Sequence, residues 1–110
     1  MTEELPMEES TIYMNYRQAV TQAERLQAQA EQMSRLAGSR MADMMTRLSG
    51  NWKGENADAY LAKCAALQEK MLRTARGLSA AAESIRTAAE RTYKAEMRAL
   101  ELARQRSYGG

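Results

Sequence analysis

The sequence predicts an all-α protein, an antiparallel two-helix hairpin that dimerises into a four-helix bundle. Three observations support this class. Ala, Leu, Met, Glu, Gln, Arg and Lys, the strongest helix formers, make up most of the 110 residues. Aliphatic β-branched residues, which favour strands, are limited to Ile12, Val20 and Ile85. The only proline is Pro6, so nothing after it obligatorily breaks a helix.

The length fits a single domain over residues 1–110. Turn formers cluster at 49–54, between two helical patterns at about 8–48 and about 55–105. Such a short connection makes the two helices antiparallel neighbours. We expect Asn51 to cap the second helix and a short flexible tail to follow that helix.

Each predicted helix carries an apolar seam with spacings of three and four residues, the pattern of paired helices. One step of the first seam, from Ala37 to Met41, is one residue too long, beside Gly38. The large seam residues predicted to hold the hairpin and the dimer together are Leu26, Met33, Met41, Met44, Leu61, Leu67, Met71, Leu78 and Ile85.

Charge and apolar surface add two expectations. Four glutamates lie in the first nine residues, and five basic residues lie between Arg91 and Arg106, so an antiparallel hairpin brings opposite charges together. Apolar residues off the seams are too many for two helices to cover, and thin cores are commonly completed by association. These residues are Tyr13, Val20, Leu36, Met45, Tyr60, Leu72 and Ala81.

Composition argues against most catalytic chemistry. The chain has no His, and its single Cys64 can form neither an internal disulfide nor a thiolate cluster. No Gly-rich phosphate loop and no membrane-spanning apolar run is present. Glutamates dilute the basic stretch near the end, which argues against nucleic-acid binding. We therefore expect no enzymatic activity, no cofactor and no metal.

The middle of the chain carries a family resemblance. Trp52, Lys53 and Gly54 stand at the midpoint between two long predicted helices, and Tyr60 follows eight positions after Trp52. This arrangement resembles the WXG family, the small early-secreted-antigen-like proteins of bacterial type VII secretion. The resemblance covers residues 8 to 105 and implies that Tyr60 packs under the turn formed by Trp52 and Gly54.

The resemblance also implies partners and location. Family members form homodimers, or heterodimers with another WXG-like protein or the helical N-terminal domain of a toxin. They leave the cell folded, without a cleavable signal peptide, through a membrane-embedded ATPase. The family export signal is Tyr, three residues, then an acid. Here the acid, Glu96, comes one residue early after Tyr93, so the signal is degenerate or supplied by a partner.

The resulting hypothesis is a non-enzymatic protein, either exported by a type VII system or acting as secretion partner for a toxin. The alternative is an intracellular coiled-coil adaptor, which explains the seams equally well. A third reading, with weaker support, is interfacial membrane binding by an exposed face bearing Met and Tyr.

Overall fold

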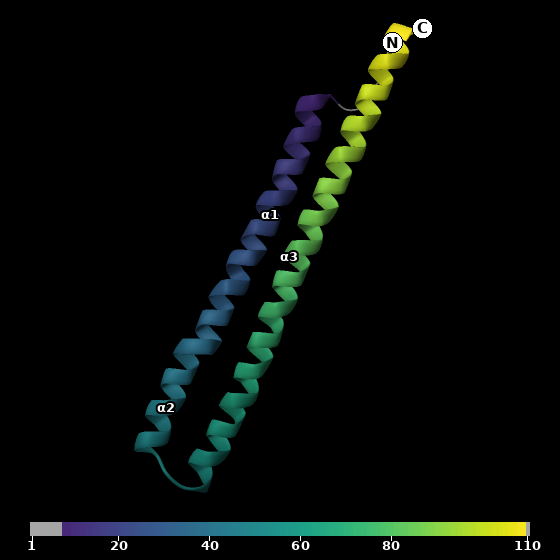
Figure 1. Ribbon diagram of the computed structural model, residues 1–110. Coiled ribbons are helices and arrows are strands. Elements are labelled where there is room, and N and C mark those ends of the chain that lie inside the picture. Colours follow the sequence, from purple (N-terminus) through teal and green to yellow (C-terminus); the bar gives the residue numbers. More distant parts are fainter. Residues whose placement is uncertain (1–7, 110) are drawn as a thin grey trace. The chain divides into compact units, whose positions relative to one another are not determined.

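The computed structural model describes residues 8–109, with side chains for residues 8–106. Over this range the protein consists of helices joined by one short turn (Figure 1). The elements are α1 (Glu9–Arg35), the π-helical segment η1 (Leu36–Arg40), α2 (Met41–Asn51) and α3 (Glu55–Gly109). The predicted all-α class is confirmed.

The chain forms two compact units. Among the described residues, unit 1 comprises residues 8–24 and 82–109, and unit 2 comprises Arg25–Ala81. In each unit a segment of the first half of the chain packs antiparallel to a segment of α3 (Figure 1). The predicted antiparallel pairing is therefore confirmed within each unit.

Small side chains dominate the core. Seven of the eleven buried apolar residues in the described chain are alanines, and Ile12, Val20, Cys64 and Leu100 complete the set. Ala23, Ala30 and Ala37 recur every seven residues in the first half of the chain, and Ala75, Ala82 and Ala89 do so in α3. A seven-residue repeat keeps one line of side chains facing a partner helix, and small residues on that line let helix backbones approach closely.

The π-helical segment lies where the predicted seam has its extra residue. Within η1 the backbone N–H of Met41 donates to the carbonyl of Leu36, five residues back. A π-turn contains one residue more than an α-turn. Every inward-facing position after it therefore lies one residue later in the sequence than regular α-helical spacing from Ala37 would place it. Met44, predicted on the seam, is accordingly 42% exposed, and the next residue, Met45, is half-buried. The seam of the first half continues through Met41, Met45 and Leu48.

A similar shift of the inward-facing position occurs in α3. Leu67, predicted on the seam, is 52% exposed, whereas the neighbouring Gln68 is half-buried. Spacings of four and three run from Cys64 through Gln68 to Met71, in step with the rest of α3. The inward position between Cys64 and Met71 therefore belongs to a polar residue, which a search for apolar periodicity passes over.

The element ends also differ from the prediction. The first helical stretch extends to Asn51, whose side-chain amide donates to the carbonyl of Arg47 at 3.0 Å. Asn51 thus closes α2 instead of capping the next helix. Helix α3 continues to Gly109, beyond the predicted end near residue 105, and Gly110 lies outside the described residues.

Unit 1 contains the expected charge pairing. A guanidinium nitrogen of Arg104 lies 3.4 Å from a carboxylate oxygen of Glu9. Both side chains are more than half exposed, so this pair contributes little to stability, about 0–1 kcal/mol.

Candidate functional site

The turn between α2 and α3 is built around a glycine that has a special backbone conformation. Trp52 is extended, with φ −132° and ψ 122°, and its N–H donates to the carbonyl of Leu48 at 2.8 Å. Gly54 has φ +115°, a region that side chains disfavour. Its carbonyl accepts the N–H of Asp58 at 3.0 Å, which starts the hydrogen bonding of α3. Gly54 therefore sets the direction in which α3 leaves the turn.

The two aromatic residues of the turn motif contact each other. The ring centroids of Trp52 and Tyr60 are 5.8 Å apart, with 53° between the ring planes. Such tilted pairs are favourable beyond the area that they bury. Trp52 is nevertheless 42% exposed and Tyr60 49% exposed. The turn thus presents an aromatic pair at the surface of unit 2, and the indole is not enclosed between the helices of this chain.

Tyr93 and Glu96, the candidate degenerate export signal, lie in unit 1 beside a cluster of tyrosines. The ring of Tyr93 lies 4.8 Å from that of Tyr16 and 6.4 Å from that of Tyr13, between centroids. Tyr93, Glu96 and Tyr16 line a groove of about 290 Å³, whose walls also include small side chains such as Ala88. Tyr93 and Glu96 are both half-buried, so each combines packing within unit 1 with a surface at the groove.

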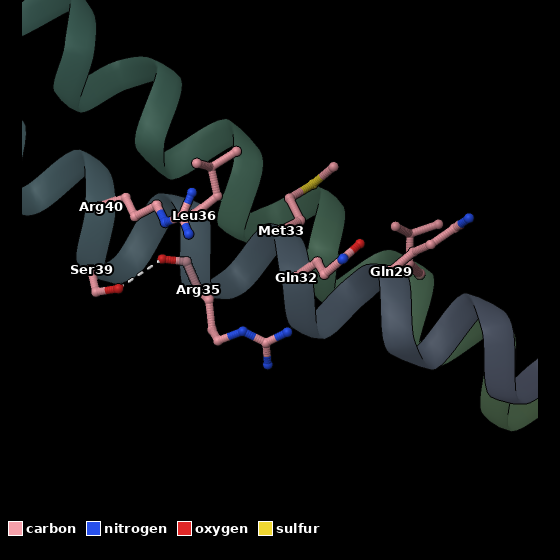
Figure 2. Close-up of a pocket in the computed structure, with 8 residues that line it drawn as sticks. Gln29, Gln32, Met33, Arg35, Leu36, Ser39 and Arg40 are labelled. Carbon is pink, nitrogen blue, oxygen red and sulfur yellow. Dashed lines mark hydrogen bonds between the residues drawn. The ribbon is translucent and has the colours of Figure 1, made fainter.

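A larger groove, of about 640 Å³, follows the π-helical segment in unit 2. Met33 and Leu36 project from the same side of the helix, whereas the guanidinium of Arg35 points away from them (Figure 2). Leu78 of α3 lines the groove from the other helix. The hydroxyl of Ser39 donates to the carbonyl of Arg35 at 3.0 Å, so this polar group of the lining is already bonded within the helix.

The large residues predicted to form the seam fall into two groups. Those that are half-buried are Leu26, Met33, Met41, Leu61, Met71, Leu78 and Ile85. Met44 and Leu67 are exposed at 42% and 52%. The two exposed residues contribute more to the surface that a partner could cover than to the contact between the two helices of this chain.

Gln68 is a residue that sequence reasoning missed. Its side-chain amide donates to the carbonyl of Ala37 at 2.7 Å, from α3 to the π-helical segment. Strict alternation of four and three along α3 would have placed Gln68 inward. The π-helical groove was also missed, although the over-long step beside Gly38 marks its position.

Within 8–106 there is no cluster of three or more side chains able to hold a metal ion together. No helix in the described part of the chain has the length and apolar character required to cross a bilayer.

Comparisons with known proteins add no relative. No protein-family model, no curated protein and no solved structure matches this chain.

Proposed function

We propose that this chain is a WXG-type helical-hairpin protein of a bacterial type VII secretion system. In this role it is either exported or acts as secretion partner of a toxin, and it works through helix-bundle association. The observation that carries the proposal is the turn at Trp52 and Gly54, which joins two antiparallel helices and sets Trp52 against Tyr60, eight residues later. This is the arrangement that the family resemblance implies.

Exposed apolar side chains support association as the mode of action. Large apolar residues 42% to 58% exposed occur in both units, and a partner that covers such side chains removes apolar surface from water. They are Tyr13, Met14, Leu36, Met44, Trp52, Tyr60, Leu67 and Leu102. We propose that a second helical hairpin covers part of this surface, either a copy of this chain or a WXG-like partner.

The sequence around Tyr93 favours the partner role. The acid expected four positions after the tyrosine is replaced by Met97, and Glu96 stands one position earlier. In a heterodimer the other subunit would supply the export signal. An intracellular coiled-coil adaptor remains the second candidate, because the paired helices and the heptad spacing of buried alanines serve it equally well.

Export in the source organism tests the proposal. Deleting the gene of the type VII ATPase should remove the chain from the culture supernatant while its amount inside the cell is maintained. An unchanged amount in the supernatant, with a cytoplasmic marker confirming intact cells, would exclude type VII export. Absence from the supernatant in both strains would favour the adaptor.

Two matched variants address the role of Glu96. Glu96→Gln removes the carboxylate next to Tyr93, and Glu101→Gln removes an exposed carboxylate in the same unit. If the chain carries its own signal, only Glu96→Gln should reduce export. If a partner carries the signal, both variants should be exported normally as long as the partner is present.

A further inference from the structure

We propose that the groove beside the π-helical segment is a docking site for an acidic amphipathic helix of another protein. The groove lies within unit 2 and is separate from the turn at Trp52 and Gly54 and from Tyr93. The inference stands on the groove alone and does not require secretion.

The shape of the groove fits a helix. Seven residues of the first half of the chain line it, at positions 29, 32, 33, 35, 36, 39 and 40, so that each successive helical turn contributes to the lining. At 1.5 Å per residue these positions span about 16 Å, or three turns. A groove of this length, which follows one helical stretch and is bordered by Leu78 of α3, accommodates the side-chain ridge of another helix. A flat lipid surface would not fill it.

The apolar floor supplies the anchor contacts. Met33 and Leu78 are half-buried in the groove wall, and Leu36 between them is 44% exposed. A leucine or similar residue of the incoming helix would cover Leu36 and remove apolar surface from water.

The charge of the lining selects an acidic partner. The guanidinium of Arg40 lies on the Leu36 side of the helix (Figure 2). Gln29 and Gln32 add side-chain amides, which can donate to carboxylates, and no carboxylate belongs to the lining. Over residues 8–106 the structure shows no ion pair of Arg40. Residues 25–81 carry nine Lys and Arg against five Asp and Glu, so the surrounding field also favours an anionic helix.

A displayed library of amphipathic helices tests the site directly. The library consists of helical peptides with varied apolar stripes, and the purified full-length chain is the target. The positions that flank each stripe are all Glu, all Gln or all Lys. We expect Glu-flanked peptides to be enriched and to bind with the strongest affinity in fluorescence anisotropy. Absence of enrichment, or equal enrichment of Glu- and Lys-flanked peptides, overturns the proposal.

Two groove variants and two matched controls locate the binding. Leu36→Ser should weaken the selected peptides about tenfold, as loss of a central anchor does. Arg40→Glu should weaken Glu-flanked peptides about fivefold and shift enrichment towards Lys-flanked peptides, which loss of structure would not do. The controls are Ala99→Ser and Arg98→Glu, both at exposed positions in unit 1 and outside the groove. Equal weakening by the controls would place binding elsewhere and contradict the proposal.

Two further measurements separate the other occupants. Vesicles of phosphatidylglycerol and phosphatidylcholine report binding to an anionic membrane, and sedimentation velocity reports self-association. Vesicle binding that Leu36→Ser abolishes, without peptide enrichment, would overturn the proposal in favour of a membrane surface. Loss of self-association in Leu36→Ser, again without peptide enrichment, would assign the groove to contact between copies.

Discussion

The side-chain amide of Gln68 donates a 2.7 Å hydrogen bond to the main-chain carbonyl of Ala37. Ala37 is buried and belongs to the π-helical segment, in which the preceding carbonyl, that of Leu36, bonds five residues ahead. Where such a segment returns to ordinary α-helical bonding, one carbonyl is passed over by the backbone N–H groups. The side chain of Gln68 therefore supplies an N–H donor for a carbonyl that this bonding pattern leaves without one. A buried carbonyl without a donor lowers the stability of the folded state.

Gln68→Ala should lower the free energy of unfolding by about 1 kcal/mol, because it removes this hydrogen bond. The measurement is urea unfolding followed by circular dichroism. Gln105→Ala is the matched control, since Gln105 is exposed and bonds only along its own helix, to Glu101 at 3.4 Å. Equal effects of the two substitutions would mean that the contact with Ala37 adds nothing specific.

Deletion of Gly38 should convert the π-helical segment into regular α-helix and leave the protein folded. The inward-facing residues Ala37, Met41, Met45 and Leu48 are separated by four, four and three positions. Removing one residue shortens the first step to three and restores the regular alternation, so the same side chains stay on the seam. Deletion of Ala28, within α1, should be strongly destabilising, because it rotates every later seam position by about 100°. Helical content and midpoints of thermal unfolding compare the two, and similar losses would contradict the role given to the extra residue.

The two changes should also be coupled. In the chain lacking Gly38, the carbonyl of Ala37 gains an ordinary helical donor, so Gln68→Ala should cost less than in the full chain. A double-mutant cycle measures the difference, and the expected coupling energy is about 1 kcal/mol. Additive effects would show that Gln68 acts independently of the π-helical geometry.

Ala30→Leu should destabilise the protein by about 1–3 kcal/mol or change its association state. Ala30 is 2% exposed and lies on the line of buried alanines, where added methylenes force the two helices apart. Ala28→Leu, at an exposed position of the same helix, should change stability by less than about 0.5 kcal/mol. Denaturant unfolding and sedimentation velocity compare the pair. A neutral Ala30→Leu would indicate that the helices are not tightly apposed there.

Gly54→Ala should destabilise the protein by about 1–2 kcal/mol, whereas Gly77→Ala should stabilise it by about 0.5–1 kcal/mol. An added Cβ meets no atom within 4 Å at either position, so the backbone alone distinguishes them. Gly54 has φ +115° in the turn, and Gly77 lies inside α3, where alanine is the better helix former. Thermal unfolding checks both signs, and a stabilising Gly54→Ala would mean that the turn adopts another backbone conformation.

Trp52→Ala should lower the free energy of unfolding by about 1–3 kcal/mol, less than the roughly 3–5 kcal/mol typical of a buried aromatic residue. The reason is that the indole is 42% exposed and packs on Tyr60 at a centroid distance of 5.8 Å. Unfolding at several protein concentrations separates two contributions. A loss near the upper limit that grows with protein concentration would show that a second chain buries the indole.

The helical class and the antiparallel pairing could be predicted because both depend on local information. Residue propensity and the three- and four-residue repeat are properties of the sequence, and a short turn leaves little freedom in how its helices meet. The candidate site was predictable only in part. The resemblance to the WXG family implies the contact between Trp52 and Tyr60 that the structure contains. It does not imply the exposure of Trp52, because that depends on how far the helices close over the turn.

The sequence by itself determined that the chain folds into paired helices, where it turns and that one seam carries an extra residue beside Gly38. Only the tertiary structure decided that a π-helical segment accommodates the extra residue. It also decided which side chains turn inward after that segment and which polar side chain donates a hydrogen bond to it. The π-helical segment brings Met45 inward in place of Met44, and Gln68 in place of Leu67 faces the carbonyl of Ala37. Periodicity defines one face of a single helix, whereas the rotation of one helix against another is fixed only when their side chains and backbone groups meet.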